Sequence, residues 1–234
     1  MSEKLEIGTF VFNPFEENTF IINISGSNAA IIVDPGCDSA EEKERLESYL
    51  AAKNLRPVAI LLTHGHLDHT RGVAYLQKHY GIPVYGSPLD DEKINATIKG
   101  FFDSLSENFD LTPVEDGQHL NVAGLDFTII TTPGHSPGGV CFHEENEHLL
   151  ITGDTLFAGA IGRSDLPGGD YDKLIVSIMD KLMGSDGDTC ILPGHGPSTT
   201  IADERTNNPF LQPFNEPEEG EDSEAEPLTI SHEC

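Results

Sequence analysis

Histidine and aspartate side chains that follow short apolar runs are the residues of this sequence with the clearest capacity for chemistry. They are His64, His66, Asp68, His69, His135, Asp154 and His195. The first four lie within six residues, and each of the others follows an apolar run and has a glycine beside it. Imidazole and carboxylate groups without cysteine suit zinc, iron or manganese ions. Because chance rarely produces such a cluster, the sequence predicts a metal site.

The spacing divides these residues into two groups of ligands. Two histidines that are two positions apart in an extended loop point to the same side. The aspartate and histidine that follow them fall at the start of a predicted helix and face a neighbouring direction. Two ions about 3.5–4 Å apart, sharing one carboxylate, would use every ligand. The first group is His64, His66 and His135, the second is Asp68, His69 and His195, and Asp154 is the bridge.

Apolar runs separated by turns predict the elements that position these ligands. Predicted strands cover 9–12, 18–23, 29–33, 58–63, 125–131, 139–143, 149–152 and 190–192, and predicted helices cover 41–52, 68–80 and 171–183. Residues 88–112 are amphipathic and are interpreted as a helix or an insertion. Strands in both halves with helices between them favour sheets covered by helices. Strand ends and their loops are where such folds gather functional groups.

Net charge narrows the choice of partners. The chain of 234 residues has 13 Lys and Arg against 40 Asp and Glu, a formal charge of −27. Such a field repels phosphate backbones and anionic lipid surfaces, so we expect neither a nucleic-acid nor a membrane partner. No apolar stretch approaches the ~20 residues of a membrane span. The N-terminus lacks the features of a secretory signal, and the four scattered cysteines favour free thiols, so we expect a cytoplasmic protein.

Part of this charge lies in an acidic segment near the C-terminus. Residues 216–226 hold seven acidic side chains and no basic one. Such a stretch buries no apolar surface and repels itself. We therefore expect one folded domain over residues 1–212 and a solvated, disordered tail over 213–234. The sequence does not specify the oligomeric state.

The segment Thr63-His64-Gly65-His66-Leu67-Asp68-His69 resembles the signature of the metallo-β-lactamase superfamily. The later ligands His135, Asp154 and His195 match that superfamily's ligand positions in order, and the resemblance covers about residues 7–205. It implies an α/β (α+β) metallo-β-lactamase fold, a four-layer αβ/βα sandwich of two mixed sheets flanked by helices. A dinuclear site would lie at one edge of the two sheets.

Residue types within the superfamily favour its glyoxalase II branch in a compact bacterial form. β-Lactamases of the commonest class carry Cys and Arg where this chain has Asp154 and His69, and flavodiiron enzymes carry Glu where His66 stands. The complete set of seven ligands is similar to that of glyoxalase II. Further segments that resemble compact members are 13–19, 162–170, and Glu204-Arg205 with 208–210.

The resemblance implies a hydrolase of small-molecule thioesters, typically hydroxyacylglutathione (S-lactoylglutathione), with two divalent ions, zinc first and iron or manganese as alternatives. Such ions lower the pKa of bound water from about 15.7 to about 7, so that a bridging hydroxide would attack the thioester. We expect Asp68 to orient this hydroxide besides binding metal. Asp34 would accept a hydrogen bond from a ligand imidazole, or it forms a simple Asp-Pro-Gly turn. Arg163 would meet a substrate carboxylate or pair with Asp165 or Asp170.

Two differences from glyoxalase II, and a second activity known in the superfamily, mean that the sequence does not specify the substrate. Longer glyoxalase II enzymes append a helical domain that binds the glutathione carboxylates, and their basic-x-Tyr contact corresponds to Arg163 and Asp165, without the tyrosine. The alternative activity is that of a mononuclear-iron persulfide dioxygenase, which uses the equivalents of His64, His135 and Asp154. Metal stoichiometry, oxygen uptake and thioester cleavage separate the two. A non-enzymatic domain is disfavoured because no ligand is missing.

Overall fold

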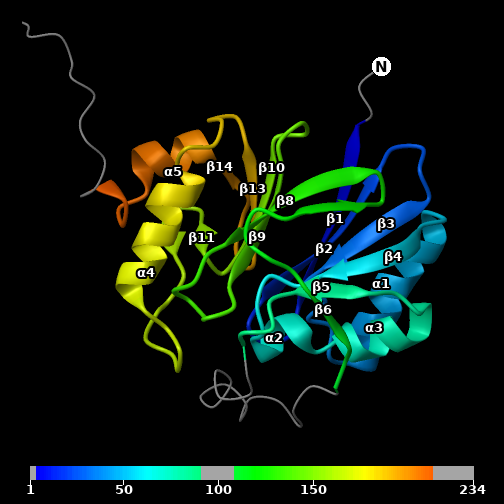
Figure 1. Ribbon diagram of the computed structural model, residues 1–234. Helices are drawn as coiled ribbons and strands as arrows, with labels where there is room; N and C mark the ends of the chain where they lie inside the picture. The colour runs from blue at the N-terminus through cyan, green and yellow to red at the C-terminus, as the bar shows by residue number, and fades with distance from the viewer. Residues whose placement is uncertain (1–3, 91–107, 213–234) are drawn as a thin grey trace, which may run out of the picture.

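The computed structural model describes residues 4–90 and 108–212, which form two six-stranded sheets packed face to face (Figure 1). The first sheet has the order β1 (Leu5–Phe12), β2 (Glu17–Ile24), β3 (Ala29–Val33), β4 (Arg56–Leu61), β5 (Val84–Gly86) and β6 (Leu111–Pro113). The second has the order β14 (Thr199–Thr200), β13 (Cys190–Pro193), β10 (Leu149–Gly153), β9 (Val140–Glu144), β8 (Leu125–Thr131) and β7 (His119–Val122). Strands β11 (Leu156–Phe157) and β12 (Ala160–Ile161) form a separate hairpin. Both sheets are mixed, with parallel pairs β3–β4, β4–β5 and β5–β6 in the first and β10–β13 in the second.

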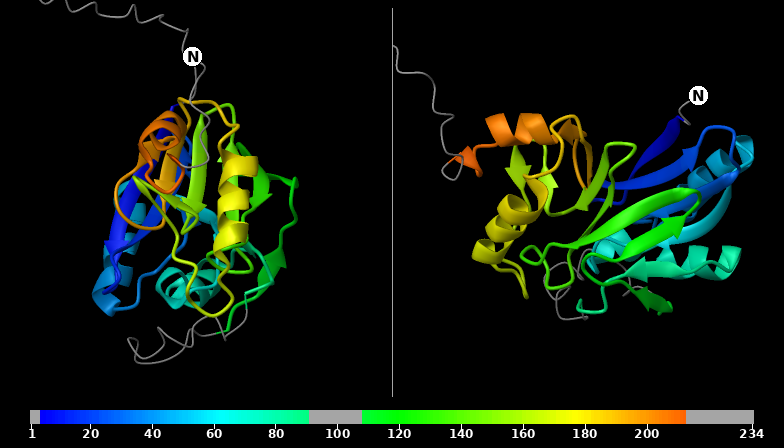
Figure 2. Two further views of the ribbon diagram at one scale, coloured as in Figure 1. Left: turned by 90° about the vertical axis from the view of Figure 1, so that its left-hand side faces the viewer. Right: turned by 45° about the horizontal axis from the view of Figure 1, so that its top comes forward.

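Helices cover the outer face of each sheet (Figure 2). The first sheet is covered by α1 (Ala40–Ala52) and α3 (Val73–Tyr80), and the short α2 (Leu67–Thr70) lies at the sheet edge. The second is covered by α4 (Tyr171–Val176), its π-helical continuation η3 (Ser177–Leu182) and α5 (Ile201–Asn207). The layers therefore run helix, sheet, sheet, helix, which confirms the predicted four-layer sandwich.

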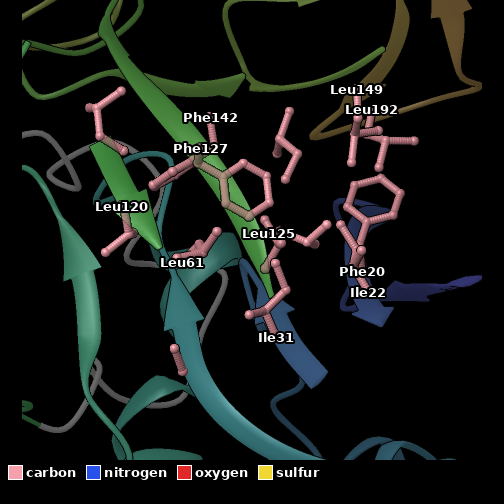
Figure 3. Packing of buried hydrophobic residues seen from close by; sticks show 14 of the residues in the cluster. Phe20, Ile22, Ile31, Leu61, Leu120, Leu125, Phe127, Phe142, Leu149 and Leu192 are labelled. Atoms are coloured by element: carbon pink, nitrogen blue, oxygen red, sulfur yellow. The ribbon is translucent and has the colours of Figure 1, made fainter. Parts of the chain in front are cut away.

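Alternation along the strands explains why both faces of each sheet are buried. Successive side chains of a strand point to opposite faces. In β9, Phe142 enters the layer between the sheets, whereas Cys141 packs against α4 and α5. In β3, Ile31 enters the same central layer and Ile32 packs against α1 and α3. Figure 3 shows the central layer, where Phe20 and Ile22 of the first sheet face side chains of the second.

Two predicted helices differ from the observed ones. The helix predicted over 68–80 is two helices, α2 and α3, because the Gly72 amide bonds to the Pro35 carbonyl at 2.7 Å and a side chain at Gly72 would overlap Cys37. The helix predicted over 171–183 changes to π-helical geometry at Ser177. Gly81 ends α3 in the left-handed conformation, as its position after the helix predicts.

Three sequence-based predictions meet the structure only in part. The segment 88–112 falls mostly on 91–107, which lies outside the described residues, and its end enters β6. The acidic tail, 213–234, also lies outside them. Cys37, Cys141 and Cys190 are free thiols, and burial raises the pKa of Cys37 to about 12. Within 4–90 and 108–212, none of the helices has both the length and the apolar character needed to cross a membrane.

Candidate metal centre

The predicted ligands all follow carboxyl ends of strands that meet at one edge of the sandwich. The segment 64–69 follows β4, His135 follows β8, Asp154 follows β10 and His195 follows β13. Asp34 follows β3, which is parallel to β4, and β10 is parallel to β13. Parallel neighbours end at the same edge of their sheet, and because the two sheets pack face to face, residues more than a hundred positions apart become neighbours. The structure brings all seven predicted ligands into one cluster.

Three histidines form the first triad: His64, His66 and His135. One ligand nitrogen from each lies within 4.8 Å of the other two. His66 Nδ1 is 2.8 Å from His135 Nε2, and the His64 ring centroid lies 4.8 Å from that of His66. All three side chains are buried. Nothing but a proton or a cation between them relieves the contact of two nitrogen lone pairs, so this geometry suits a cation.

The second triad is Asp68, His69 and His195. His69 Nε2 is 3.7 Å from Asp68 Oδ2 and 3.3 Å from His195 Nε2. Asp154 stands between the triads: its Oδ1 is 3.4 Å from His69 Nε2, and its Oδ2 is 3.5 Å from the Nε2 atoms of both His135 and His195. One carboxylate therefore faces both triads through its two oxygens, as a bridging ligand does.

Hydrogen bonds on the far side of the rings fix their tautomers. His135 Nδ1 is 2.7 Å from the Arg163 carbonyl, and His195 Nδ1 is 3.0 Å from the Phe15 carbonyl. A carbonyl only accepts, so each Nδ1 carries a proton and Nε2 is the nitrogen that can present a lone pair to a cation in the cluster. His69 Nδ1 similarly lies 3.0 Å from Asp34 Oδ2. The sequence analysis left Asp34 between this role and a simple turn, and the structure places it against the ligand imidazole.

Asp34, His64 and His69 also lie close enough together to hold a cation. The Asp34 carboxylate, however, accepts the amide and hydroxyl of Thr63 and faces His69 Nδ1. These hydrogen bonds occupy its oxygens, so we interpret Asp34 as a support of His69.

The chemistry of the donor atoms fits divalent cations. His64 Nε2, His66 Nε2, Asp68 Oδ1 and Asp154 Oδ1 are buried and have no hydrogen-bond partner among the described residues. Leaving such an atom unsatisfied costs about 1–3 kcal/mol, and a bound cation removes that cost. The arrangement is typical of a binuclear His/Asp site.

Electrostatics favours the protonation states that metal binding needs in the first triad and the bridge, whereas the carboxylates of Asp68 and Asp154 outweigh burial and raise the pKa of His69 and His195, so a cation would displace a proton there. Burial lowers the pKa of His66 to about 4 and that of His64 well below its ordinary value, so both rings are neutral at pH 7. Burial raises the pKa of Asp154, but the neighbouring His69 and His195 outweigh it and hold that pKa well below the ordinary value. Neutral imidazoles and an anionic carboxylate are the forms that bind metals.

The sequence analysis missed the asparagines that hold the second triad in place. Asn13 Nδ2 donates to the Asp68 carbonyl at 2.8 Å, and Asn18 Nδ2 donates to the carbonyls of Gly196 and Pro193 at 2.8 and 3.1 Å. Asn13 lies in the turn between β1 and β2 and Asn18 at the start of β2, and the sequence analysis singled out this segment only by its resemblance to compact family members. Asn13 has a φ of 53°, a left-handed conformation that asparagine tolerates well.

A cavity of about 400 Å³ opens over the ligands. Its floor includes His66, Asp68, His135, Asp154 and His195, and its walls include Phe15, Phe157, Ala160, Ile161, Arg163 and Leu166. Arg163 thus lies at the predicted substrate site. Its exposed guanidinium also makes two parallel hydrogen bonds of 2.8 Å to Asp165. The structure therefore shows the ion pair with Asp165, which the sequence analysis gave as the alternative to binding a substrate carboxylate.

A four-layer sandwich with a His triad and an Asp/His triad at one sheet edge is typical of metallo-hydrolases with a binuclear site. Comparison with known families gives the same result. A model described as the metallo-beta-lactamase superfamily matches residues 13–195. The chain belongs to this superfamily.

Individual relatives extend this comparison. The chain is 40% identical over 210 residues to hydroxyacylglutathione hydrolase GloC of Haemophilus influenzae, covering 84% of this chain and 93% of that protein. Two solved structures are also similar. One is the BLEG-1 B3 metallo-beta-lactamase, with a TM-score of 0.79 and 34% identity over 88% of this chain and 99% of that one. The other is TTHA1623 in a di-iron-bound form, with a TM-score of 0.76 and 33% identity over 87% of this chain and 100% of that one.

Proposed function

We propose that this protein hydrolyses a thioester of the hydroxyacylglutathione type, with S-lactoylglutathione as the representative substrate. The observation that carries the proposal is the joining of two triads by Asp154 on the floor of a cavity with apolar walls. The likeness to hydroxyacylglutathione hydrolase GloC supports the same substrate class. A cytoplasmic location is also proposed, and the buried free thiols of Cys37 and Cys141 support a reducing compartment.

The proposed ligands are His64, His66 and His135 for one ion, Asp68, His69 and His195 for the other, and Asp154 for both. Zinc is the first candidate, and iron is supported by the likeness to a di-iron structure; manganese has the same ligand preferences. Two such ions supply Lewis acidity and activation of water at neutral pH. Because such ions activate water at neutral pH, the reaction does not need a histidine as a separate general base.

The remaining chemistry falls to the side chains around the cavity. The Oδ1 atom of Asp68 is buried without a hydrogen-bond partner among the described residues, and Asp68 also lines the cavity. A nucleophilic water there would donate to this oxygen, which orients its lone pair toward the thioester carbon. The rings of Phe15 and Phe157 would exclude bulk water from the reacting carbonyl. Arg163 would meet a carboxylate of the thiol half at the cavity wall.

A substrate panel tests the proposal. The purified full-length chain, loaded separately with zinc, iron and manganese, is assayed with S-lactoylglutathione, a thioester of a neutral thiol, a chromogenic β-lactam, and glutathione persulfide in an oxygen electrode. We expect thioester cleavage that chelation removes and added metal restores. The matched control is Asp154→Ala, which should fold but neither retain metal nor turn over substrate.

Other outcomes of the panel would overturn the proposal. Oxygen uptake with one iron per chain and no thioester cleavage would indicate a persulfide dioxygenase. Cleavage of the β-lactam alone would indicate a β-lactamase. Thioester hydrolysis by Asp154→Ala at the parent rate would remove the metal centre from the reaction.

A further inference from the structure

Asp90 joins the two loops that carry the first triad. Its Oδ2 accepts hydrogen bonds from the Gly65 amide at 2.8 Å and from the Ser136 hydroxyl at 2.9 Å, and its Oδ1 accepts one from the Gly138 amide at 2.6 Å. Gly65 lies between two ligands of the triad, and Ser136 follows the third. One carboxylate thus bonds to both segments from which the triad is built.

The sheet explains how Asp90 reaches this place. Strand β5 is parallel to β4, with Ile60 paired to Val84 and Leu61 to Tyr85. The chain therefore leaves β5 at the edge where the loop after β4 begins. Asp90 lies four residues beyond the end of β5, beside that loop.

The first triad depends on the relative position of these two loops. His66 and His135 are 69 residues apart in the chain, and their nitrogens are 2.8 Å apart in space. One backbone hydrogen bond, from the Val140 amide to the Thr63 carbonyl at 2.9 Å, joins the segments where they leave the sheets. Beyond that bond, the three hydrogen bonds to Asp90 tie the loop tips that carry the rings.

Gly138 shows how closely the second loop approaches Asp90. A Cβ atom at this position would lie 2.7 Å from Asp90 Cγ and 2.8 Å from Asp90 Oδ1, closer than such atoms approach. The backbone of the second loop thus lies directly against the carboxylate, and a side chain at Gly138 would displace it. The loop that carries His135 therefore packs its backbone against the Asp90 carboxylate.

We propose that Asp90 is a positioning residue that sets the geometry of the first triad and leaves the second triad unaffected. This inference rests on the metal site proposed above, because it assigns Asp90 a role in cation affinity through His64, His66 and His135. Asp90 lies among neither the ligands nor the residues that line the cavity. Outer hydrogen-bond partners of metal ligands typically change metal affinity by about 10–100-fold.

Zinc affinity in two backgrounds tests the proposal. The His195→Ala chain keeps the first triad, and the His135→Ala chain keeps the second. Asp90→Ala is added to each, and the zinc Kd is measured by competition with a chromophoric chelator. We expect a Kd at least tenfold higher in the His195→Ala background and a change of less than twofold in the His135→Ala background. Glu44→Ala, which removes one charge from the exposed face of α1, is the control in both.

Several results would overturn the proposal. An unchanged Kd in the His195→Ala background would remove Asp90 from the triad. An equal loss in both backgrounds would indicate a general effect on the fold, which circular dichroism and thermal unfolding of the metal-free chains would also register. Failure of the unmodified chain to bind zinc, iron or manganese would overturn both this inference and the metal site. Zinc affinity does not depend on substrate, so a chain that cleaves no thioester can still show the triad-selective loss.

Two further variants keep the test decisive if Asp90→Ala does not fold. Asp90→Asn keeps the shape but places an NH2 group against one of the three donors, so we expect an intermediate loss in the His195→Ala background. Gly138→Ala should weaken zinc binding there by displacing the carboxylate. Combined with Asp90→Ala, it should add little, because the new methyl group then has space. Additive effects of the two substitutions would contradict the proposed contact.

Discussion

Asp34 Oδ2 lies 3.0 Å from His69 Nδ1, and this contact connects the residue that follows β3 to helix α2, which follows β4. The same carboxylate accepts the Thr63 amide at 2.7 Å through Oδ1, so its orientation is fixed from two directions. Asp34 has a φ of 43°, an uncommon backbone conformation that turns its side chain toward the ligand. A strained turn is thus held in place beside the proposed second ion.

The first prediction concerns this contact. Asp34→Ala leaves His69 without an acceptor for its Nδ1 proton, so the ring is free to rotate or change tautomer. We expect the metal affinity of the second triad to fall by about 10–100-fold, measured as metal content after dialysis against a graded chelator. Asp188→Ala, at an exposed position, should retain full metal. Full metal retention in the Asp34 variant as well would show that the contact does not support the ligand.

The second prediction uses the close approach of Gly194 to the cluster. An added Cβ would lie 2.3 Å from Asp154 Oδ1 and 2.7 Å from His69 Cε1. The φ at Gly194 is not in the left-handed region, so alanine can adopt the backbone conformation of this residue. Gly194→Ala should therefore fold but separate the bridge from the second triad. We expect loss of about one metal per chain and a kcat at least tenfold lower. Gly184→Ala, which meets nothing within 4 Å, is the control. Parental metal content and kcat would contradict this geometry.

The third prediction concerns Arg163, whose guanidinium is bound by Asp165. The hydrogen bonds of Arg163 lower the pKa of Asp165 to about 2, so this carboxylate is ionised and competes with a substrate carboxylate at pH 7. Asp165→Asn should lower the KM for S-lactoylglutathione about two- to fivefold, the range expected for an exposed ion pair. Arg163→Gln should raise it. A thioester of a neutral thiol is the control, and equal changes for both substrates would exclude carboxylate recognition.

The sequence was sufficient to predict the cluster and sheets covered by helices from local pattern, whereas the four-layer order came from the resemblance to the superfamily. Each ligand comes directly after an apolar run, and the carboxyl ends of strands gather at one edge. The alternation in β3 and β9 likewise assigns side chains to one face or the other. These features need no knowledge of loop conformation.

The residues that hold the ligand loops in place could not be predicted, because no local sequence pattern identifies them. Asn13 reaches the Asp68 carbonyl across 55 residues, and Asp90 reaches Ser136 across 46. Asparagine or aspartate near a turn is ordinarily interpreted as a turn residue. The break at Gly72 has the same origin, since it depends on the Pro35 carbonyl and the Cys37 side chain. Contacts between loops distant in sequence decided each of these features.

The final prediction concerns pH and stability at Asp116, which anchors the end of β8 shortly before His135. Its Oδ1 accepts the Thr131 amide at 2.7 Å and the Thr131 hydroxyl at 2.8 Å, and Lys181 lies 3.2 Å away. Burial is the largest single effect and raises the pKa of Asp116, but the hydrogen bonds from Thr131 and Lys181 together outweigh it and hold that pKa below its ordinary value. A lowered folded-state pKa adds stability above the unfolded-state pKa of about 3.9 and loses it as the pH falls further.

Asp116→Asn should therefore lower the free energy of unfolding at pH 7 by on the order of 1 kcal/mol, a modest value because solvent screens this exposed side chain. The difference from the parent should shrink as the pH falls below the unfolded-state pKa of about 3.9, because protonation makes the parent aspartate resemble asparagine. Urea unfolding of the metal-free chains at a series of pH values measures it. Glu115→Gln, an exposed neighbour, should change stability little across the series. A deficit that stays constant down to pH 3 would mean that the lost interaction does not depend on the charge of Asp116.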